Sequence, residues 1–244
     1  MALVWSLVGL IVGPFLAHAI RRLPGREGLR VMPVCGVCGE TLPFRAFSSL
    51  LASILGSRGG CGLCGAGPDG QGVAVELVTA AAFGGLFLRY GATPMLLLTS
   101  FYTSILIVVL FIDWRHRLIL NRVTYPGLVL ALILTPAVAP VTPGMTLLGA
   151  AFGGLVFGLV FEVGLLVYRK PAIALGDVKL AALVGAMAGY PAVLTALLLG
   201  TFAGAVASVA LLATRRGSRH DYMPYGPALC VGTYLSFFIN LLGA

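Results

Sequence analysis

An aspartate inside an apolar stretch is the first feature of the chain that could do chemistry. Asp177 lies in "ALGDVKL", at the start of a long apolar run in a chain with only eight acidic residues. An ionisable group at membrane depth costs at least ~2.5 to 3.5 kcal/mol, and such groups usually mark functional sites. A second aspartate, Asp113, ends another apolar run in "FIDWRHRLIL". The two carboxyl groups are candidates for acid and base chemistry if the fold brings them together.

Four of the five cysteines form two CxxC pairs in a polar segment. They are Cys35 with Cys38 and Cys61 with Cys64. Four thiolates in this pattern suit a closed tetrahedral zinc site. Redox-active thiols and metal-free cysteines stay open as alternatives, whereas disulfides are disfavoured on a cytoplasmic side, where thiols are kept reduced. Cys230 stands alone in an apolar stretch and is expected to be a small core residue.

The composition is that of a polytopic membrane protein. Hydrophobic residues make up 59% of the chain and charged residues 10%, against roughly 25% charged residues in soluble domains. The formal charge of +8 reflects scarce acids, and the bases lie in short clusters between apolar runs. The positive-inside rule explains such clusters, so we expect no nucleic-acid partner.

Apolar runs of about 17 to 25 residues predict eight transmembrane helices. They cover residues 2–20, 73–88, 93–112, 123–141, 145–168, 172–188, 191–213 and 225–242. The sixth and seventh runs are separated at "GYPAV", because proline disfavours helix at the residue before it. Runs such as "GAAFGGLVFG" hold small residues four apart, which permit close helix packing. We predict an all-α membrane protein with a first transmembrane helix (1–20), a cytoplasmic zinc loop (21–72) and a core of about seven helices (73–244).

Lys and Arg are distributed unevenly between alternate loops. Fifteen of the 16 follow the first, third, fifth and seventh spans, and only Arg89 lies opposite. Cytoplasmic loops carry the excess of these bases, so both termini are expected outside and the large charged loops in the cytoplasm. This topology brings Asp113, at the end of the third span, to the same membrane face as Asp177, at the start of the sixth.

Two carboxyl groups that share a site have coupled protonation. This is what an aspartic protease needs, because the ionised partner takes a proton from water while the protonated one polarises the scissile carbonyl. The alternative is that each acid pairs at the headgroup level with a nearby base such as Arg115, Arg117 or Lys179. Lys179 could also contact lipid phosphate or substrate.

Four motifs resemble the type IV prepilin peptidase family, membrane aspartic proteases of the GxGD class. They are "VGPFLAHAIRRLP", "IDWRHRLILNRVTYP", "GDVKLAALVGAMAG" and "MPYGPAL", in matching order and spacing. The resemblance implies that Asp113 and Asp177 are the catalytic pair and that Cys35, Cys38, Cys61 and Cys64 hold zinc. It also implies cleavage of prepilin or pseudopilin leader peptides on the cytoplasmic side of the bacterial inner membrane. Many members also methylate the new N-terminus from S-adenosylmethionine.

The chain departs from the family pattern at three positions. Ala174 replaces the first glycine of GxGD, and Pro14 and Ala17 replace the serine and asparagine of the N-terminal signature. The absence of this serine and asparagine weakens the expectation of methylation more than that of proteolysis. Two other functions stay open, a family member that binds pilins without cutting them and a proton-coupled transporter that uses the membrane carboxylates as a relay.

Two further acids lie within the predicted spans. Glu76, near the start of the second span, could bind substrate or S-adenosylmethionine. The alternative is a carboxylate at a helix start, which the helix dipole favours by ~0.3 to 1 kcal/mol. Glu162 lies near the end of the fifth span and could pair inside the bundle with a base such as Lys179, or neutralise positive charge on a leader peptide.

Overall fold

The structure of this protein is a computed structural model. The model describes residues 1–25, 38, 48–54, 64, 70–169, 173–213 and 225–239. Across these ranges every regular element is a helix, which confirms the predicted all-α class. The chain divides into two compact units, Met1–Leu96 and Leu97–Ala244.

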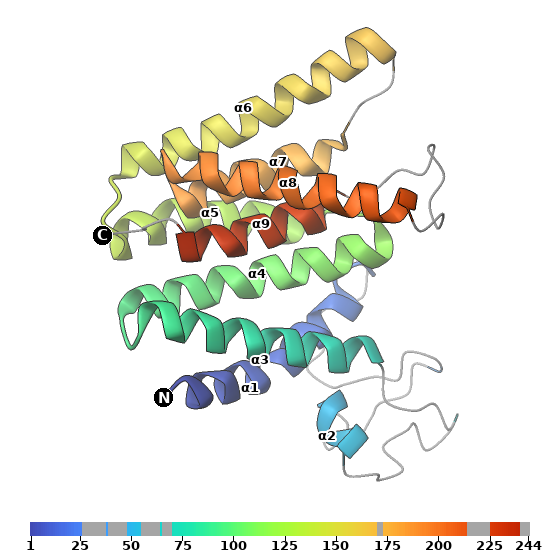
Figure 1. Ribbon diagram of the computed structural model, residues 1–244, viewed down its shortest axis with the longest axis vertical. Helices are drawn as coiled ribbons and strands as arrows, with labels where there is room; N and C mark the ends of the chain where they lie inside the picture. The colour runs from blue at the N-terminus through green and yellow to red at the C-terminus, as the bar shows by residue number, and fades with distance from the viewer. Residues whose placement is uncertain are drawn as a thin grey trace. The chain divides into compact units, whose positions relative to one another are not determined.

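The first unit is built on two long helices that lie side by side (Figure 1). Helix α1 (Ala2–Arg22) packs along α3 (Gly70–Tyr90), and the short α2 (Ser49–Ile54) packs against α3. Two glycines one turn apart on α1 make the contact close. A Cβ at Gly9 would lie 2.8 Å from the carbonyl oxygen of Thr79, and one at Gly13 would lie 2.7 Å from the Cα of Glu76. Larger side chains there would push the two helices apart.

The second unit is arranged around α7. Its helices are α4 (Pro94–His116, which begins just before the unit boundary), α5 (Asn121–Val138), α6 (Pro143–Tyr168), α7 (Leu175–Ala188), α8 (Ala192–Ala213) and α9 (Gly226–Ile239). Helix α7 contacts α5, α6, α8 and α9. The side chains of Leu180, Leu183 and Val184 on α7 are completely buried. The helix that carries Asp177 is therefore enclosed by protein over much of its length.

Glycines allow the closest helix contacts of this unit. A Cβ at Gly149 of α6 would clash with the carbonyl oxygen of Gly185 on α7, and one at Gly153 would clash with that of Ala181. Gly200 of α8 and Gly232 of α9 meet in the same way. Lipid offers apolar helices no hydrophobic reason to associate, so contacts of this kind carry much of the packing energy. The packing expected of the glycine-rich run is confirmed.

A buried chain of hydrogen bonds joins three helices of the second unit. The hydroxyl of Thr135 on α5 donates to the carbonyl oxygen of Ala186 on α7 at 3.0 Å. The hydroxyls of Tyr102 on α4 and Thr135 are 2.7 Å apart. Because the single proton of Thr135 is used on Ala186, the Tyr102 hydroxyl is the donor to Thr135. Satisfied polar links of this kind fix helices against one another in an apolar bundle.

Six of the described helices are long and apolar enough to cross a membrane. They are α1, α3, α4, α5, α6 and α8. The eight predicted spans all correspond to helices, but α7 and α9 have only 14 residues each, and the six-residue α2 was not predicted. The predicted break at "GYPAV" is confirmed, since α7 ends at Ala188 and Gly189 takes a positive φ of 70° before α8 begins. These features are those of a multi-pass membrane protein.

Candidate active site

Asp113 lies in the last turn of α4. Its carbonyl oxygen accepts a hydrogen bond of 2.8 Å from the N–H of Arg117. Arg117 has a left-handed φ of 52° and turns the chain toward α5. The Asp113 side chain is only 4% exposed, so the helix end presents its carboxyl group to the interior of the second unit.

Asp177 is the third residue of α7. Its Oδ2 accepts a hydrogen bond of 3.1 Å from the backbone N–H of Ala174, the residue that caps the helix. Ala174 has φ −76° and ψ 149°, an extended conformation that alanine adopts without strain. The replacement of the first glycine of GxGD therefore causes no backbone difficulty at this position.

The structure brings the two aspartates together. Asp113 and Asp177, from α4 and α7, interact electrostatically, and both interact with Cys230 of α9. Cys230 is fully buried, as expected for a core cysteine. The juxtaposition predicted from the order of the spans is thus present within one unit, although the carboxyl groups are far apart in sequence.

Two glycines and one isoleucine shape the surroundings of the carboxyl pair. A Cβ at Gly226 would lie 2.5 Å from Oδ2 of Asp113 and 3.4 Å from Cδ1 of Ile119. A Cβ at Gly176 would lie 2.9 Å from Cβ of Ile119. Ile119, in the connection between α4 and α5, therefore lies against the first residues of both α7 and α9.

One oxygen of the pair is buried without a hydrogen bond. Oδ2 of Asp113 has no hydrogen-bond partner within the described parts of the chain. Buried polar atoms are normally satisfied, and an exception calls for an explanation. Water or a substrate group that enters the site would find an unused acceptor at this oxygen.

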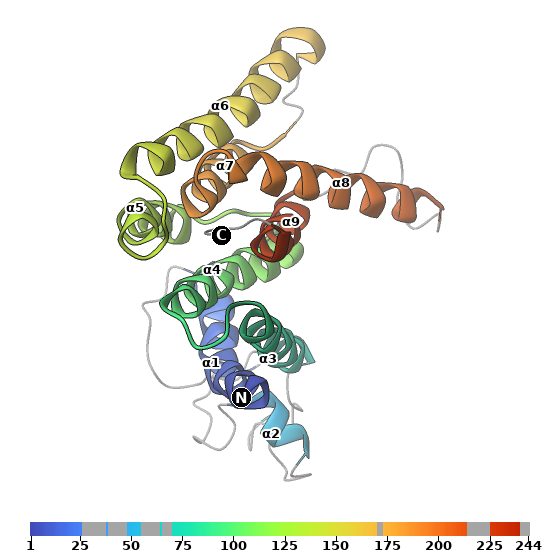
Figure 2. The ribbon, with the colours of Figure 1, turned by 60° about the vertical axis from the view of Figure 1, so that its left-hand side comes forward.

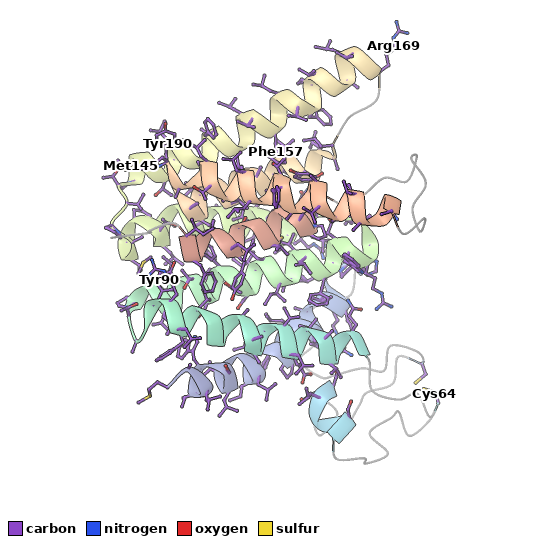
Figure 3. The ribbon with its side chains drawn as sticks, in the orientation of Figure 1. Cys64, Tyr90, Met145, Phe157, Arg169 and Tyr190 are labelled. Atoms are coloured by element: carbon purple, nitrogen blue, oxygen red, sulfur yellow. The ribbon has the colours of Figure 1, made fainter. Side chains whose placement is uncertain are left out.

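An aromatic side chain lies beside the pair. Tyr225, just before α9, interacts electrostatically with Asp177. Its ring centroid is 5.6 Å from that of Phe157 on α6, which is labelled in Figure 3. Helix α6 therefore reaches the surroundings of Asp177 at the level of Phe157.

The base closest in sequence to Asp177 has other partners. The Nζ of Lys179 donates to Oδ1 of Asn121 at 3.0 Å and lies 5.3 Å from the ring centroid of Tyr125. Both partners are on α5. Lys179 is exposed only in part, and its contacts match the expectation that residues two apart on a helix do not face each other.

Glu76 of the first unit is engaged by the start of α2. Its Oε1 accepts from the N–H of Ser49 at 2.7 Å. Its Oε2 accepts from the hydroxyl of Ser48 at 2.7 Å and from the N–H of Leu50 at 3.2 Å. The side chain is completely buried. The carboxylate thus caps a helix, but the helix is α2 and not the one to which Glu76 belongs.

The predicted zinc ligands are described only in part. Cys38 and Cys64 lie at exposed turn positions, and Figure 3 labels Cys64. Cys35 and Cys61 lie outside the described residues. Among the residues that are described, no group of three or more His, Cys, Asp or Glu side chains could hold a metal. The four-cysteine zinc site stays a prediction.

Two buried, interacting aspartates in a multi-pass helical membrane protein could perform the acid and base chemistry of peptide-bond hydrolysis. Residues 100–209 match the type IV leader peptidase family, and residues 7–90 match the bacterial peptidase A24 N-terminal domain. The chain belongs to the type IV leader peptidase family and is a peptidase of that class.

Relatives agree with this assignment over almost the whole chain. A prepilin leader peptidase/N-methyltransferase of Myxococcus xanthus (strain DK1622) is 33% identical over 91% of this chain and 67% of its own length. One of Pseudomonas putida is 31% identical over 95% and 88%, and one of Bacillus subtilis (strain 168) is 29% identical over 95% and 91%. No solved structure was found to match.

Sequence reasoning missed several neighbours of the pair. Gly226 and Tyr225 lie in the quoted motif "MPYGPAL", but no role was predicted for them. The hydrophobic pattern of the sequence did not predict the contact between Ile119 and Gly176, because this contact joins a loop to the start of a helix. The apolar run predicted the helix α9, but only the quoted motif indicated that its start could belong to the site.

Gly226→Ala is expected to slow peptide cleavage strongly. The new Cβ would meet the Asp113 carboxyl group, and a displacement of about 1 Å at a reacting group can cost ~10²-fold in rate. The measurement is the cleavage rate of a prepilin peptide, with thermal unfolding to confirm folding. Gly154→Ala is the matched control, since its Cβ would make an ordinary contact of 3.4 Å with Ala182. Equal rates for the two variants would contradict the placement of Gly226.

Glu76→Gln is expected to loosen α2 from α3. The glutamine side chain keeps one acceptor oxygen but places its NH₂ group opposite a donor that the carboxylate had bound. An unsatisfied buried polar group of this kind costs ~1 to 3 kcal/mol. Hydrogen exchange at the Ser49 and Leu50 amides should become faster. Glu162→Gln, which changes an exposed acid in the other unit, should leave this exchange as it is. Unchanged exchange in Glu76→Gln would show that the carboxylate does not hold α2.

Proposed function

We propose that this chain cleaves the leader peptides of type IV prepilins or pseudopilins and that Asp113 and Asp177 are its catalytic pair. The observation that carries the proposal is the meeting of two buried carboxyl groups at the ends of α4 and α7. The names of the relatives supply the substrate class. A non-cutting pilin-binding protein would have no need for an acidic pair in an apolar interior, where charge is costly.

The chemistry follows from a pair that shares one proton. The ionised carboxylate takes a proton from a water molecule, and the water oxygen bonds to the scissile carbonyl carbon. The protonated carboxyl group donates to the carbonyl oxygen and stabilises the negative charge that develops there. The C–N bond then breaks, and the leaving amine takes up a proton from the pair. The free Oδ2 of Asp113 is a suitable acceptor for the incoming water.

The proposed membrane arrangement has eight spans, with the carboxyl pair at the cytoplasmic edge of the inner membrane. Fifteen of the 16 Lys and Arg residues fall on that side in this topology. A 14-residue helix is only ~21 Å long, shorter than the ~30 Å hydrocarbon core. Helix α7 can be that short because protein surrounds it, so its ends need not meet lipid.

N-methylation of the new N-terminus is proposed as a second activity. The support is the match of residues 7–90 to the N-terminal domain and the double name of the relatives. Glu76 is the proposed contact to S-adenosylmethionine or substrate in this part of the chain. Since its oxygens already accept three hydrogen bonds from α2, such a ligand would have to replace at least one of them.

A zinc ion held by Cys35, Cys38, Cys61 and Cys64 is proposed for the cytoplasmic loop. The support is the chemistry of the donor set, four thiolates in two CxxC pairs, and the exposure of Cys38 and Cys64 at turns. The ion would fix the shape of a segment with few large apolar residues.

A proton-coupled transporter is supported less well. A relay through Asp113, Asp177 and Glu162 would place acids along an enclosed path. Asp113 and Asp177 are buried together, whereas Glu162 is exposed on α6. The acids therefore form one paired site and one separate surface group.

Asp113→Asn and Asp177→Asn should each abolish cleavage while the protein stays folded. Asparagine is near-isosteric but cannot transfer the proton. The measurement uses purified protein in detergent, a prepilin peptide and mass detection of products, with and without S-adenosylmethionine. A product heavier by one methylene group, formed only with the methyl donor, would support methylation. Cleavage that persists in both variants, or an inert wild type on a range of leaders, would overturn the proposed function.

Purified protein should contain about one zinc ion per chain, because one tetrahedral site uses all four thiolates. Elemental analysis measures this, and Cys38→Ser or Cys64→Ser should lose the metal, whereas Cys230→Ser should keep it. With a chelator present to remove the ion, a membrane-impermeant maleimide should label Cys38 and Cys64 in opened cells but not in intact cells. Metal-free wild type would refute the zinc site, and labelling of intact cells would refute the cytoplasmic placement.

A further inference from the structure

The connection between α4 and α5 is fixed at both of its ends. It consists of residues 117–120. At one end the N–H of Arg117 donates to the carbonyl oxygen of Asp113 at 2.8 Å. At the other end the carbonyl oxygen of Leu120 accepts a hydrogen bond of 3.1 Å from the N–H of Thr124. Side chains on a segment that is held in this way have little freedom to move with respect to the two helices.

Ile119 turns its side chain from this connection into the protein. It is partly buried, whereas its neighbour Leu118 is 51% exposed. A Cβ at Gly176 would lie 2.9 Å from Cβ of Ile119 and 3.4 Å from its Cγ1 and Cδ1. A Cβ at Gly226 would lie 3.4 Å from the same Cδ1. The end of one side chain therefore lies between the first turn of α7 and the first turn of α9.

The presence of Ile119 explains why position 176 is a glycine. Gly176 lies within α7 and does not have a positive φ, so the backbone itself would accept an L-residue. The three atoms nearest to a Cβ at this position all belong to Ile119. Gly226 likewise does not have a positive φ, and a Cβ there would meet Asp113 as well as Ile119. The two glycines thus leave the space that Ile119 occupies.

Each of these glycines adjoins one member of the carboxyl pair. Gly176 precedes Asp177 in the chain, and Gly226 faces Oδ2 of Asp113. Figure 1 shows the end of α4 and the starts of α5, α7 and α9 at one end of the second unit. In both Figure 1 and Figure 2, α9 lies between α4 and α8. A change in the bulk of Ile119 would therefore shift the helix starts that surround both carboxyl groups.

We propose that Ile119 is a positioning residue for the carboxyl pair. Its side chain fills the space beside Gly176 and Gly226 and keeps the starts of α7 and α9 at the separation at which Asp113 and Asp177 act together. The inference rests on the proposed function, and Ile119 acts through the pair without contact to the scissile bond. Reacting groups must be held within ~0.5 Å of their productive positions, and close-packed interiors transmit the loss of even one methylene group.

The first test removes the atom that lies beside both glycines. Ile119→Val lacks Cδ1 and should lower kcat for a prepilin peptide about tenfold with KM almost unchanged, since small displacements of reacting groups are costly. Ile119→Leu restores a δ-methyl group and should stay within about threefold of wild type. Leu118→Val, the loss of one methylene group at the exposed neighbour, is the matched control and should behave like wild type. Thermal unfolding of each full-length variant in detergent measures folding.

A second readout reports on the pair itself. In one prepilin peptide a hydroxyethylene group replaces the scissile amide, so that the peptide resembles the transition state and its hydroxyl group contacts both carboxyl groups. Ile119→Val should bind this peptide about tenfold more weakly than wild type does. The unmodified peptide should bind equally to Asp177→Asn and to Asp177→Asn with Ile119→Val, because this affinity does not require the pair. A purely structural role for Ile119 would lower both affinities.

A double-mutant cycle tests the contact between Ile119 and Gly176. Gly176→Ala should lower kcat about 10²-fold, because its new Cβ would meet Ile119 and displace the start of α7. Ile119→Gly removes all three atoms that this Cβ would meet. The double variant should therefore be more active than the product of the two single effects, as is typical of residues in contact. Effects that simply multiply would overturn the inference.

The outcomes separate the failure of this inference from that of the function. If wild type cleaves the peptide and Asp177→Asn does not, but Ile119→Val keeps the wild-type kcat, the peptidase function stands and the role of Ile119 is wrong. The same conclusion follows if Ile119→Val weakens the binding of both peptides equally, or if Ile119→Leu loses as much activity as Ile119→Val. If wild type cleaves none of a range of prepilin peptides, the proposed function fails and this inference fails with it.

Discussion

Close backbone contact between α6 and α7 at glycine is the constraint on which the second unit depends. Gly149 and Gly185 meet where any side chain would clash, and this contact sets where α7 lies against its neighbours. Helix α7 in turn carries Asp177 and contacts three further helices. A carboxyl group on a helix fixed in this way can be presented to a second carboxyl group from α4 with little freedom to move away.

Much of this arrangement could be predicted from the sequence. Apolar runs gave the positions of eight helices because length and hydropathy are local properties. The meeting of Asp113 and Asp177 could be predicted because a membrane has only two faces. The two predicted spans between these residues return the chain to the face that it left, so both residues fall at helix ends on one face. The small residues four apart in "GAAFGGLVFG" predicted close packing, although not which helix would be the partner.

The remaining features depend on contacts that no local pattern contains. Glu76 has the sequence context of a helix start, yet its partners are the backbone N–H groups of α2, a helix too short to be predicted. Cys230 looked like an ordinary core residue, and only the packing of α9 sets it beside both aspartates. Lys179 was a natural partner for Glu162 until the fold turned it toward α5.

Asp177 also stabilises the first turn of α7, because its carboxyl group accepts a hydrogen bond from the N–H of Ala174. The oxygen that holds this N–H is a strong acceptor when the carboxyl group is ionised and a weaker one when it carries a proton. Each passage of the proton through the pair would therefore tighten or relax the first turn of α7. The stiffness of the first turn of α7 would then follow the protonation state of the Asp177 carboxyl group and change in every cycle of proton exchange.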